Sequence, residues 1–254
     1  MRSFAFLRRV FHENWRDRPD ALRTIYRRAI VPKIAYGAAI WAHTIARDQE
    51  IRRRLQTLQR FCTIAITASA GTVSHAATQV LAAETPLHMV ISETRARDRI
   101  LFLRDANVQH LGQTFQPLRR DELRDALRSA TMDLWQAEWN AADTGRLTHK
   151  FFPSVTARVE LHLPLNRRIT RTVTGHFLNC ADYRARILKL PDEDGLCPAC
   201  SQRDTPDHRI IFCPHFTEAR TSLINLLRLG PADTLLLENI PPHRAAWRAL
   251  EAFS

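Results

Sequence analysis

Residues 197–213 read CPACSQRDTPDHRIIFC, and they hold three of the chain's five cysteines. Within this stretch the spacing C-x2-C-x7-H-x4-C is formed by Cys197, Cys200, His208 and Cys213. Zn²⁺ prefers cysteine thiolate and histidine imidazole ligands, and four of them complete a tetrahedral structural site. The spacing therefore predicts one structural Zn²⁺ ion, against the alternative of unrelated thiols beside a surface histidine.

The residues around these four side chains indicate how such a site would close. The two-residue gap between the first two cysteines lets both sulfurs turn toward one ion, and Pro198 stiffens that turn because its φ is fixed. The second pair must fold back, so residues 210–212 (Ile, Ile, Phe) are expected to pack around the metal and keep water out. His215 is an alternative to His208 as the nitrogen ligand.

The charge of the chain suggests an acidic partner. Its formal net charge is +11, and all but three of its 37 basic residues are arginines. Arginine contacts phosphates through two N–H groups and stacks on bases. An excess of this size indicates nucleic acid as the simplest partner, with a GC-rich genome, which enriches arginine codons, as the alternative explanation.

The composition favours a mainly helical protein of a reducing compartment. The chain has 254 residues, of which 45% are hydrophobic and only 7 are glycine, so it can build a core but has few residues for tight β-turns. An odd number of cysteines cannot all pair. Cys62 and Cys180 are interpreted as buried free thiols, which indicates the nucleus or cytoplasm. The longest apolar stretch, residues 34–46, is too short to span a bilayer, so no membrane partner is expected.

Helical periodicity dominates the first third of the chain. A helix interrupted at Pro32 is expected within residues 21–46. Asp48 is predicted to cap a long helix that ends at or before Gly71. Further helices are expected after Ser74 and after Thr85-Pro86, with Thr85 as the cap. Short joints between these helices predict an all-α bundle.

The middle of the chain is expected to change character twice. Residues 106–120 show little periodicity and are interpreted as a boundary. A helix is expected from residue 121, with Trp135 and Trp139 on one face as a core seam rather than a base-stacking platform. Residues 155–163 alternate between apolar and polar side chains, which predicts a strand, with a helix as the alternative.

Two short helices before the cysteines carry a group of basic residues. They are expected at about 166–178 and 181–189, with further helices after the cysteines at about 217–229 and 242–253. The predicted nucleic-acid-binding residues are Arg167, Arg168, Arg171, Arg184, Arg186 and Lys189. The alternative is that their aliphatic stems only cover apolar helix surfaces.

Several motifs occur together in this sequence. They are Thr174-Gly175-His176, Tyr183-Arg184, Asp207-His208 and Cys213-Pro214 around the cysteines, and residues 26–41 and 145–155 before them. Together they resemble the carboxy-terminal part of non-LTR retrotransposon reverse transcriptase polyproteins, most closely the type-1 elements of insect ribosomal-RNA genes. The resemblance extends from about Tyr26 to about Arg220, and Phe177 departs from it where the family usually has a second glycine.

The resemblance implies a fold and a function. It implies a thumb-like helical bundle over residues 1–110, a connecting helix over 111–150, and a carboxy-terminal domain with the CCHC zinc knuckle over 151–254. For an intact polyprotein it implies RNA-directed DNA polymerase (nucleotidyltransferase) and endonuclease activities. The partners would be template RNA, target DNA and the remainder of the polyprotein. The chain has no Asp-Asp pair to hold catalytic Mg²⁺, so Mg²⁺ is expected only in the palm of the intact polyprotein, and no residue here is assigned as catalytic.

Two other functions fit the residues alone. One is a free-standing zinc-dependent nucleic-acid-binding protein, and the other is a helical interaction protein in which zinc only fastens the tail. Salt-dependent binding of nucleic acid would separate these two, because only phosphate contacts release counterions.

Overall fold

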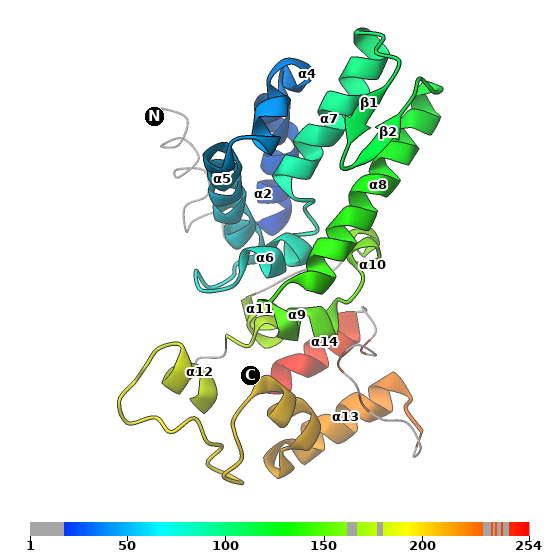
Figure 1. The fold of residues 1–254 in the computed structure, drawn as a ribbon. Coiled ribbons are helices and arrows are strands. Elements are labelled where there is room, and N and C mark those ends of the chain that lie inside the picture. Colours follow the sequence, from blue (N-terminus) through cyan, green and yellow to red (C-terminus); the bar gives the residue numbers. More distant parts are fainter. Residues whose placement is uncertain are drawn as a thin grey trace.

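The computed structural model describes residues 18–161, 167–176, 180–230, 235, 237, 240 and 244–253. The described chain is mainly helical, as the sequence predicts. Its described residues also contain a single two-stranded antiparallel sheet, which the sequence did not predict. Figure 1 shows the first helices and the sheet at one end of the molecule, and the cysteine-containing region at the opposite end. Within these residues, no helix has the length and apolarity needed to cross a membrane.

The first helical segment continues through Pro32. Its parts are α2 (Pro19–Ile25), a π-helical turn (Tyr26–Ile30) and α3 (Val31–Ala35). In the π turn the Val31 N–H donates to Tyr26 O, five residues back. A proline ring clashes with the carbonyl four residues before it in a regular α-helix, and this wider turn relieves the clash. The expected break at Pro32 is therefore wrong, and the break lies at Gly37, whose φ of 67° is left-handed. After Gly37 follow α4 (Ala38–Trp41) and a 3₁₀ turn, η3 (Ala42–Ala46).

Three packed helices follow, namely α5 (Gln49–Thr67), α6 (His75–Ala82) and α7 (Leu87–Phe102). The Asp48 carboxylate accepts the N–H groups of Glu50 and Ile51 at 2.8 and 3.2 Å, which confirms that cap. The helix α6 begins after Ser74, as predicted, and the Ser74 side chain caps it by accepting the Ala77 N–H. The predicted Thr85 cap is wrong, because α7 starts after Pro86 and its first N–H is bound by the buried Gln59 side chain at 2.8 Å.

Residues 106–120, which were interpreted as a boundary, contain the sheet. Strands β1 (Val108–His110) and β2 (Gln113–Phe115) pair antiparallel around Leu111 and Gly112. Both turn residues have positive φ, 49° and 84°, as two-residue hairpin turns of type I′ require. Sequence reasoning missed this hairpin because each strand has only three residues.

The hairpin leads into α8 (Arg120–Ala141), the longest described helix, followed by α9 (Arg146–Phe151) and α10 (Val155–Glu160). Trp135 and Trp139 are buried, which confirms the core seam. The strand predicted over 155–163 is wrong as far as residue 161, and residues 162 and 163 lie outside the described part. Ser154 caps a helix there by accepting the Ala157 N–H at 3.2 Å.

The remaining elements surround the cysteines. They are α11 (Arg167–Thr174), α12 (Ala181–Arg186), the π turn η4 (His208–Phe212), η5 (Pro214–Phe216), α13 (Thr217–Leu227), α14 (Arg244–Leu250) and η7 (Glu251–Phe253). One apolar cluster joins Val80 of α6, Trp139 of α8, Val155 of α10, Ile210 of η4 and Leu223 of α13. The metal-binding candidates thus sit directly on the main core. The domain limits at residues 110 and 150 stay predictions.

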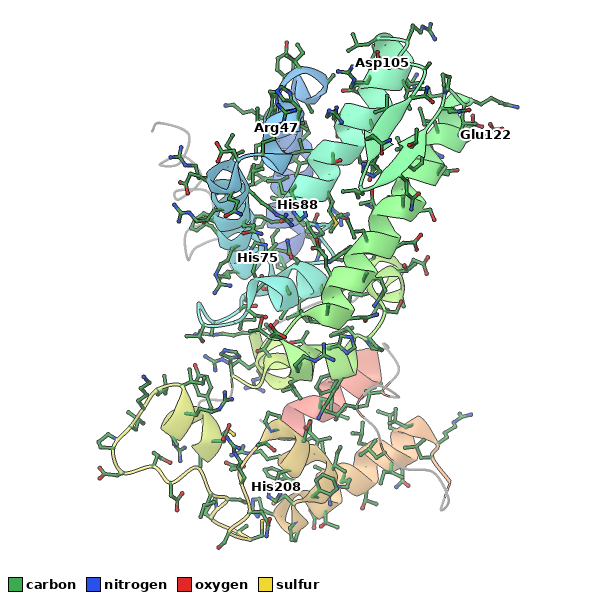
Figure 2. The ribbon with its side chains drawn as sticks, in the orientation of Figure 1. Arg47, His75, His88, Asp105, Glu122 and His208 are labelled. Carbon is green, nitrogen blue, oxygen red and sulfur yellow. The ribbon has the colours of Figure 1, made fainter. Side chains whose placement is uncertain are left out.

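The two ends of the molecule are marked by labelled side chains in Figure 2. Asp105 and Glu122 lie at the end formed by α7, the hairpin and the start of α8, and His208 lies at the other end.

Candidate metal centre

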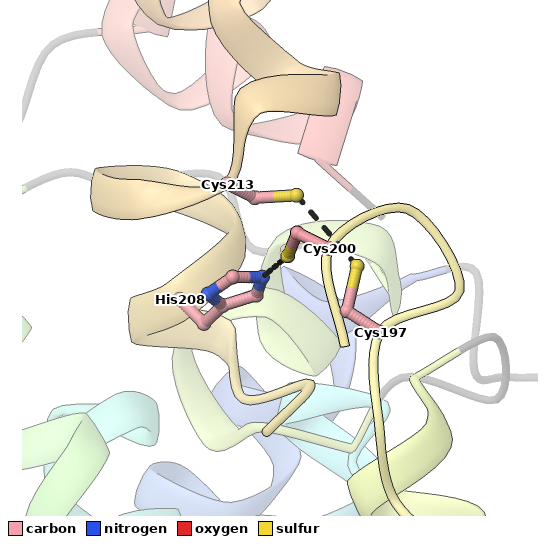
Figure 3. A group of neighbouring side chains, drawn as sticks. All are labelled: Cys197, Cys200, His208 and Cys213. Carbon is pink, nitrogen blue, oxygen red and sulfur yellow. Dashed lines mark hydrogen bonds between the residues drawn. The ribbon is translucent and has the colours of Figure 1, made fainter. Parts of the chain in front are cut away.

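The structure brings Cys197, Cys200, His208 and Cys213 together. One ligand atom from each, three sulfurs and one ring nitrogen, lie within 4.8 Å of one another. Figure 3 shows all four side chains pointing toward a common centre from two segments of the chain. Cys197, His208 and Cys213 are buried, and Cys200 is half-buried. His208, rather than His215, contributes the nitrogen to this group.

The spacing of these atoms fits a tetrahedral metal ion. The Cys197 and Cys213 sulfurs are 3.7 Å apart, and Cys200 Sγ is 3.1 Å from His208 Nε2. Zinc–sulfur bonds of about 2.3 Å at tetrahedral angles place two sulfurs roughly 3.8 Å apart. A disulfide needs about 2.05 Å, so the sulfur pair has the separation of two ligands rather than of a covalent bridge.

A tight loop positions the first two cysteines. The Cys197 N–H donates to Gln202 O at 2.7 Å, and the Ser201 N–H donates to Cys197 O at 2.8 Å. Ser201 has a left-handed φ of 57°, which reverses the chain. Leu196 and Arg203 pair as an isolated antiparallel bridge across the base of the loop. The loop therefore turns both sulfurs inward, as the two-residue gap predicted.

A π-helical turn positions the other two ligands. The Cys213 N–H donates to His208 O at 2.7 Å, five residues back along the chain. In an α-helix, residues five apart point about 140° away from each other. The wider π turn brings them close to one face. The H-x4-C spacing is thus explained by the backbone of η4.

The sequence relatives agree with the motifs. A Pol polyprotein from the type-1 retrotransposable element R1 4 of Nasonia vitripennis is 29% identical over 249 residues, 96% of this chain and 62% of that protein. The chain is a homologue of type-1 retrotransposon Pol polyproteins. A putative 115 kDa protein of element R1DM from Drosophila melanogaster is 27% identical, and an R1 Pol polyprotein from Bradysia coprophila is 25% identical. Each of these two matches covers 84% of this chain and 21% of the relative.

The chain therefore spans less than two thirds of the length of these R1 proteins. No family model matches the chain. No solved structure matches it either.

A buried ion pair supports the loop of this R1-like chain from behind. The Arg209 guanidinium donates to both oxygens of Asp204, at 2.7 and 2.8 Å, and both side chains are nearly inaccessible to solvent. The same carboxylate accepts the Ala181 N–H at 2.7 Å. Burial alone would raise the pKa of Asp204, but Arg209 and the Ala181 N–H together hold that pKa below its usual value.

Arg220 of α13 fastens the π turn. Its guanidinium donates to Ile210 O at 2.8 Å and to Cys213 O at 2.6 Å. These carbonyls lie at the end of a helical turn, where no following helical N–H groups are available to donate to them. Sequence reasoning missed Asp204, Arg209 and Arg220. The Cys/His spacing identifies the side chains that could bind a metal, but not the residues that hold the surrounding backbone in place.

The sulfurs differ in their electrostatic surroundings. Burial opposes ionisation of Cys197, but the Ala199 N–H and the neighbouring Cys213 thiol bring its pKa below the usual value. Burial raises the pKa of Cys213. A bound cation would favour the thiolate form at every one of these cysteines.

The residues between His208 and Cys213 do not all shield the site. Ile210 is fully buried, and Ile211 packs against the main core. Phe212 is 70% exposed, so its expected role in keeping water from the metal is wrong. The π turn directs it outward, which the sequence pattern alone did not reveal.

The six predicted nucleic-acid-binding residues fall into two groups. Arg184 forms a two-bonded ion pair with Glu193 at 2.6 and 3.0 Å, and Arg186 pairs with Asp182 at 3.3 Å. Arg167, Arg168 and Lys189 are exposed, and Arg171 is half-buried. Burial lowers the pKa of Arg171, and the nearby charge of Arg167 lowers it further.

The ends of α11 and α12 lie close together. The rings of His176 and Tyr183 are 5.3 Å apart. Burial lowers the pKa of His176, and the charge of Arg186 lowers it further. The two basic helices therefore form neighbouring surfaces beside the Cys/His cluster.

Proposed function

We propose that this chain is the zinc-binding and nucleic-acid-binding part of a retrotransposon polyprotein. The observation that carries the proposal is the close Cys3His cluster in a homologue of R1 Pol proteins. Zn²⁺ would be held by Cys197, Cys200, His208 and Cys213, and would fix the loop and the π turn relative to each other. With four protein ligands, no coordination position is left for catalysis.

The polymerase and endonuclease activities belong, in this proposal, to the intact polyprotein. Its reverse transcriptase would need paired carboxylates for Mg²⁺, and this sequence has no Asp-Asp pair. The chain would instead hold template RNA or target DNA, in the nucleus or another reducing compartment. Purified chain in a primer-extension assay is expected to incorporate nucleotides only at background level.

The nucleic-acid surface is assigned to α11 and the loop after α12. Arg184 and Arg186 already have carboxylate partners, so Arg167, Arg171 and Lys189 are the stronger candidates for phosphate contacts. If about four of the six predicted residues contact phosphates, the log–log salt slope should be about −3 for single strands and about −3.6 for duplex.

The test is binding of labelled RNA and duplex DNA to the full zinc-loaded chain across a salt series. The variant Arg167→Ala/Arg171→Ala should flatten the slope by about 1.4 units for single-stranded RNA and by about 1.8 units for duplex DNA. Arg47→Ala, an exposed arginine next to α5, is the matched control and should leave the slope unchanged. A slope near zero in the unmodified chain would favour the helical interaction protein instead.

A further inference from the structure

A hollow separates the end of α7 from the start of α8. Its volume is about 620 Å³, and its lining is formed by Arg97, Leu101, Phe102, Arg120, Asp121 and Arg124. Glu122, in the first turn of α8, marks this end of the molecule in Figure 2, far from His208. The hollow is therefore separate from the Cys/His cluster and from α11.

The lining has an excess of positive charge. Three guanidinium groups face one carboxylate. Arg97 pairs with Asp98 and Arg124 with Asp125, each at 2.9 Å, but these pairs join sequence neighbours at an exposed surface. Such pairs contribute little free energy, so a phosphate can replace the carboxylates. Arg120 has no ion-pair partner among the residues that the structure describes.

Two arginines stand at the amino-terminal end of α8, where a cation is unfavourable. Arg119 precedes α8, and Arg120 is its first residue, without a side-chain cap. Cations destabilise the amino-terminal end of a helix because the helix dipole is positive there. Asp121 and Glu122 in the same first turn offset part of this cost. Arg119 and Arg120 themselves bring no benefit to the helix end, and such local conflicts are expected where function requires them.

Phe102 adds an aromatic surface to the same hollow. It is the last residue of α7, and it is 69% exposed. Its neighbour Leu101 instead packs against the apolar cluster that α7 and α8 share, which includes Ile100 and Leu123. An exposed aromatic ring beside arginines matches sites that stack unpaired bases while cations bind the backbone. A duplex keeps its bases stacked inside and cannot offer a base face to Phe102 without being opened.

We propose that this hollow binds single-stranded nucleic acid, with Arg97, Arg120 and Arg124 on phosphates and Phe102 stacked on an unpaired base. The inference rests on the proposed nucleic-acid binding, and it adds a second contact surface that recognises unpaired strands.

The experiment measures fluorescence anisotropy of a labelled 20-nucleotide single-stranded RNA with the full zinc-loaded chain. Phe102→Ala should weaken binding about 5- to 150-fold, the range for loss of one stacked base. Phe102→Trp should restore it, because tryptophan presents an equal or larger ring. Arg120→Ala should reduce the salt slope by about 0.7. Binding of a duplex of the same sequence should not change in Phe102→Ala.

Two controls match the chemistry of the tested residues. Tyr36 is an exposed aromatic residue, 86% accessible, that does not line the hollow. Tyr36→Ala and Arg47→Ala should both bind like the unmodified chain. Circular dichroism checks that each variant is folded. Because the Phe102 side chain is exposed, replacing it with alanine should not unfold the protein.

The outcomes separate the two proposals. If the unmodified chain binds RNA with a salt-dependent affinity but Phe102→Ala binds equally well, the hollow is not a base-stacking site. If Phe102→Ala weakens duplex and single strand alike, recognition of unpaired bases is wrong. If the unmodified chain binds neither, the proposed function itself fails, and the hollow has no nucleic-acid role.

Discussion

At the scale of residues, the Cys/His cluster could be predicted from spacing, whereas the groups that orient its side chains could not. The cluster of three sulfurs and one nitrogen needs only the C-x2-C and H-x4-C intervals, which the sequence displays. Asp204 and Arg209 lie between those ligands in sequence, and look like ordinary surface residues there. Their burial becomes apparent only when α12 packs behind the loop through Ala181.

The choice of histidine can be tested by metal content. His208→Ala should abolish stable zinc binding, because Nε2 of His208 lies 3.1 Å from Cys200 Sγ within the cluster. His215→Ala should keep one zinc per chain, since this exposed ring instead packs edge-on against Phe216, 5.0 Å between centroids. Native mass spectrometry counts the metal. Loss of zinc in the His215 variant alone would reverse the ligand assignment.

The buried ion pair predicts a difference in stability between variants of two arginines near the Cys/His cluster, Arg209 in η4 and Arg203 in the preceding loop. Arg209→Ala leaves the Asp204 carboxylate buried without its partner, and should lower the free energy of unfolding by about 3–5 kcal/mol. Arg203→Ala breaks a pair with Asp182 in which the arginine side chain is 66% exposed, and should cost under about 1 kcal/mol. Urea unfolding of the zinc-loaded proteins measures both. Equal costs would mean that burial does not set the strength of the Asp204 pair.

At the scale of elements, periodicity identified long helices and failed for short ones. The 19 residues of α5 contain enough turns to show their apolar stripe. The six residues of α10 do not, and their alternating pattern predicts a strand. The helix forms there because Ser154 caps it and because Val155 and Arg158, three residues apart, are both buried. The hairpin was missed for the same reason of length.

His110 joins that hairpin to the two helices beneath it. Its Nδ1 lies 3.0 Å from Ser92 Oγ of α7, and its Nε2 lies 3.0 Å from Thr131 Oγ1 of α8. Burial lowers the pKa of His110 to about 4, whereas an unfolded histidine titrates near 6.5. The unfolded state therefore binds a proton at a higher pH than the folded state does.

This difference in pKa predicts that the free energy of unfolding decreases as the pH falls. The stabilisation linked to neutral His110 is complete above pH 6.5, and is lost as the pH falls toward 4, by up to about 3 kcal/mol. His110→Gln should be less stable at pH 7 but should lose less stability between pH 7 and 4. His43→Gln, which changes an exposed histidine, is the control. Chemical denaturation at each pH measures how the free energy of unfolding changes with pH. The contribution of the metal site to this change is the same in all three proteins, so it cancels in the comparison. Parallel slopes for His110→Gln and the unmodified chain would contradict the assignment.

At the scale of the whole molecule, the main core is shared between regions that the sequence separates. Val80, Trp139 and Leu223 lie more than fifty residues apart in the chain but belong to one cluster. Such contacts have no periodic signature, so a sequence can indicate the helices and the metal site but not how they pack together. The shared core connects the Cys/His end to α8, and α8 in turn extends to the Arg-lined hollow.

This arrangement predicts how nucleic-acid affinity depends on length. The helix α8 has 22 residues, which correspond to about 33 Å at 1.5 Å per residue. Because α11 packs against α9, which follows the far end of α8, a strand that contacts both the hollow and the surface of α11 must span roughly that distance. With stacked nucleotides about 3.4 Å apart, the span needs roughly 10 nucleotides.

Single-stranded RNAs of 6, 10, 14 and 20 nucleotides should therefore show a step in affinity rather than a gradual rise. Below the threshold each RNA reaches one surface only, and above it the second contact becomes intramolecular, which can strengthen binding by two or more orders of magnitude. Phe102→Ala and Arg167→Ala/Arg171→Ala should each reduce the step, because either variant weakens one of the two surfaces. Affinity that grows in proportion to length, with the same profile in both variants, would mean that the two ends of the molecule do not bind one strand together.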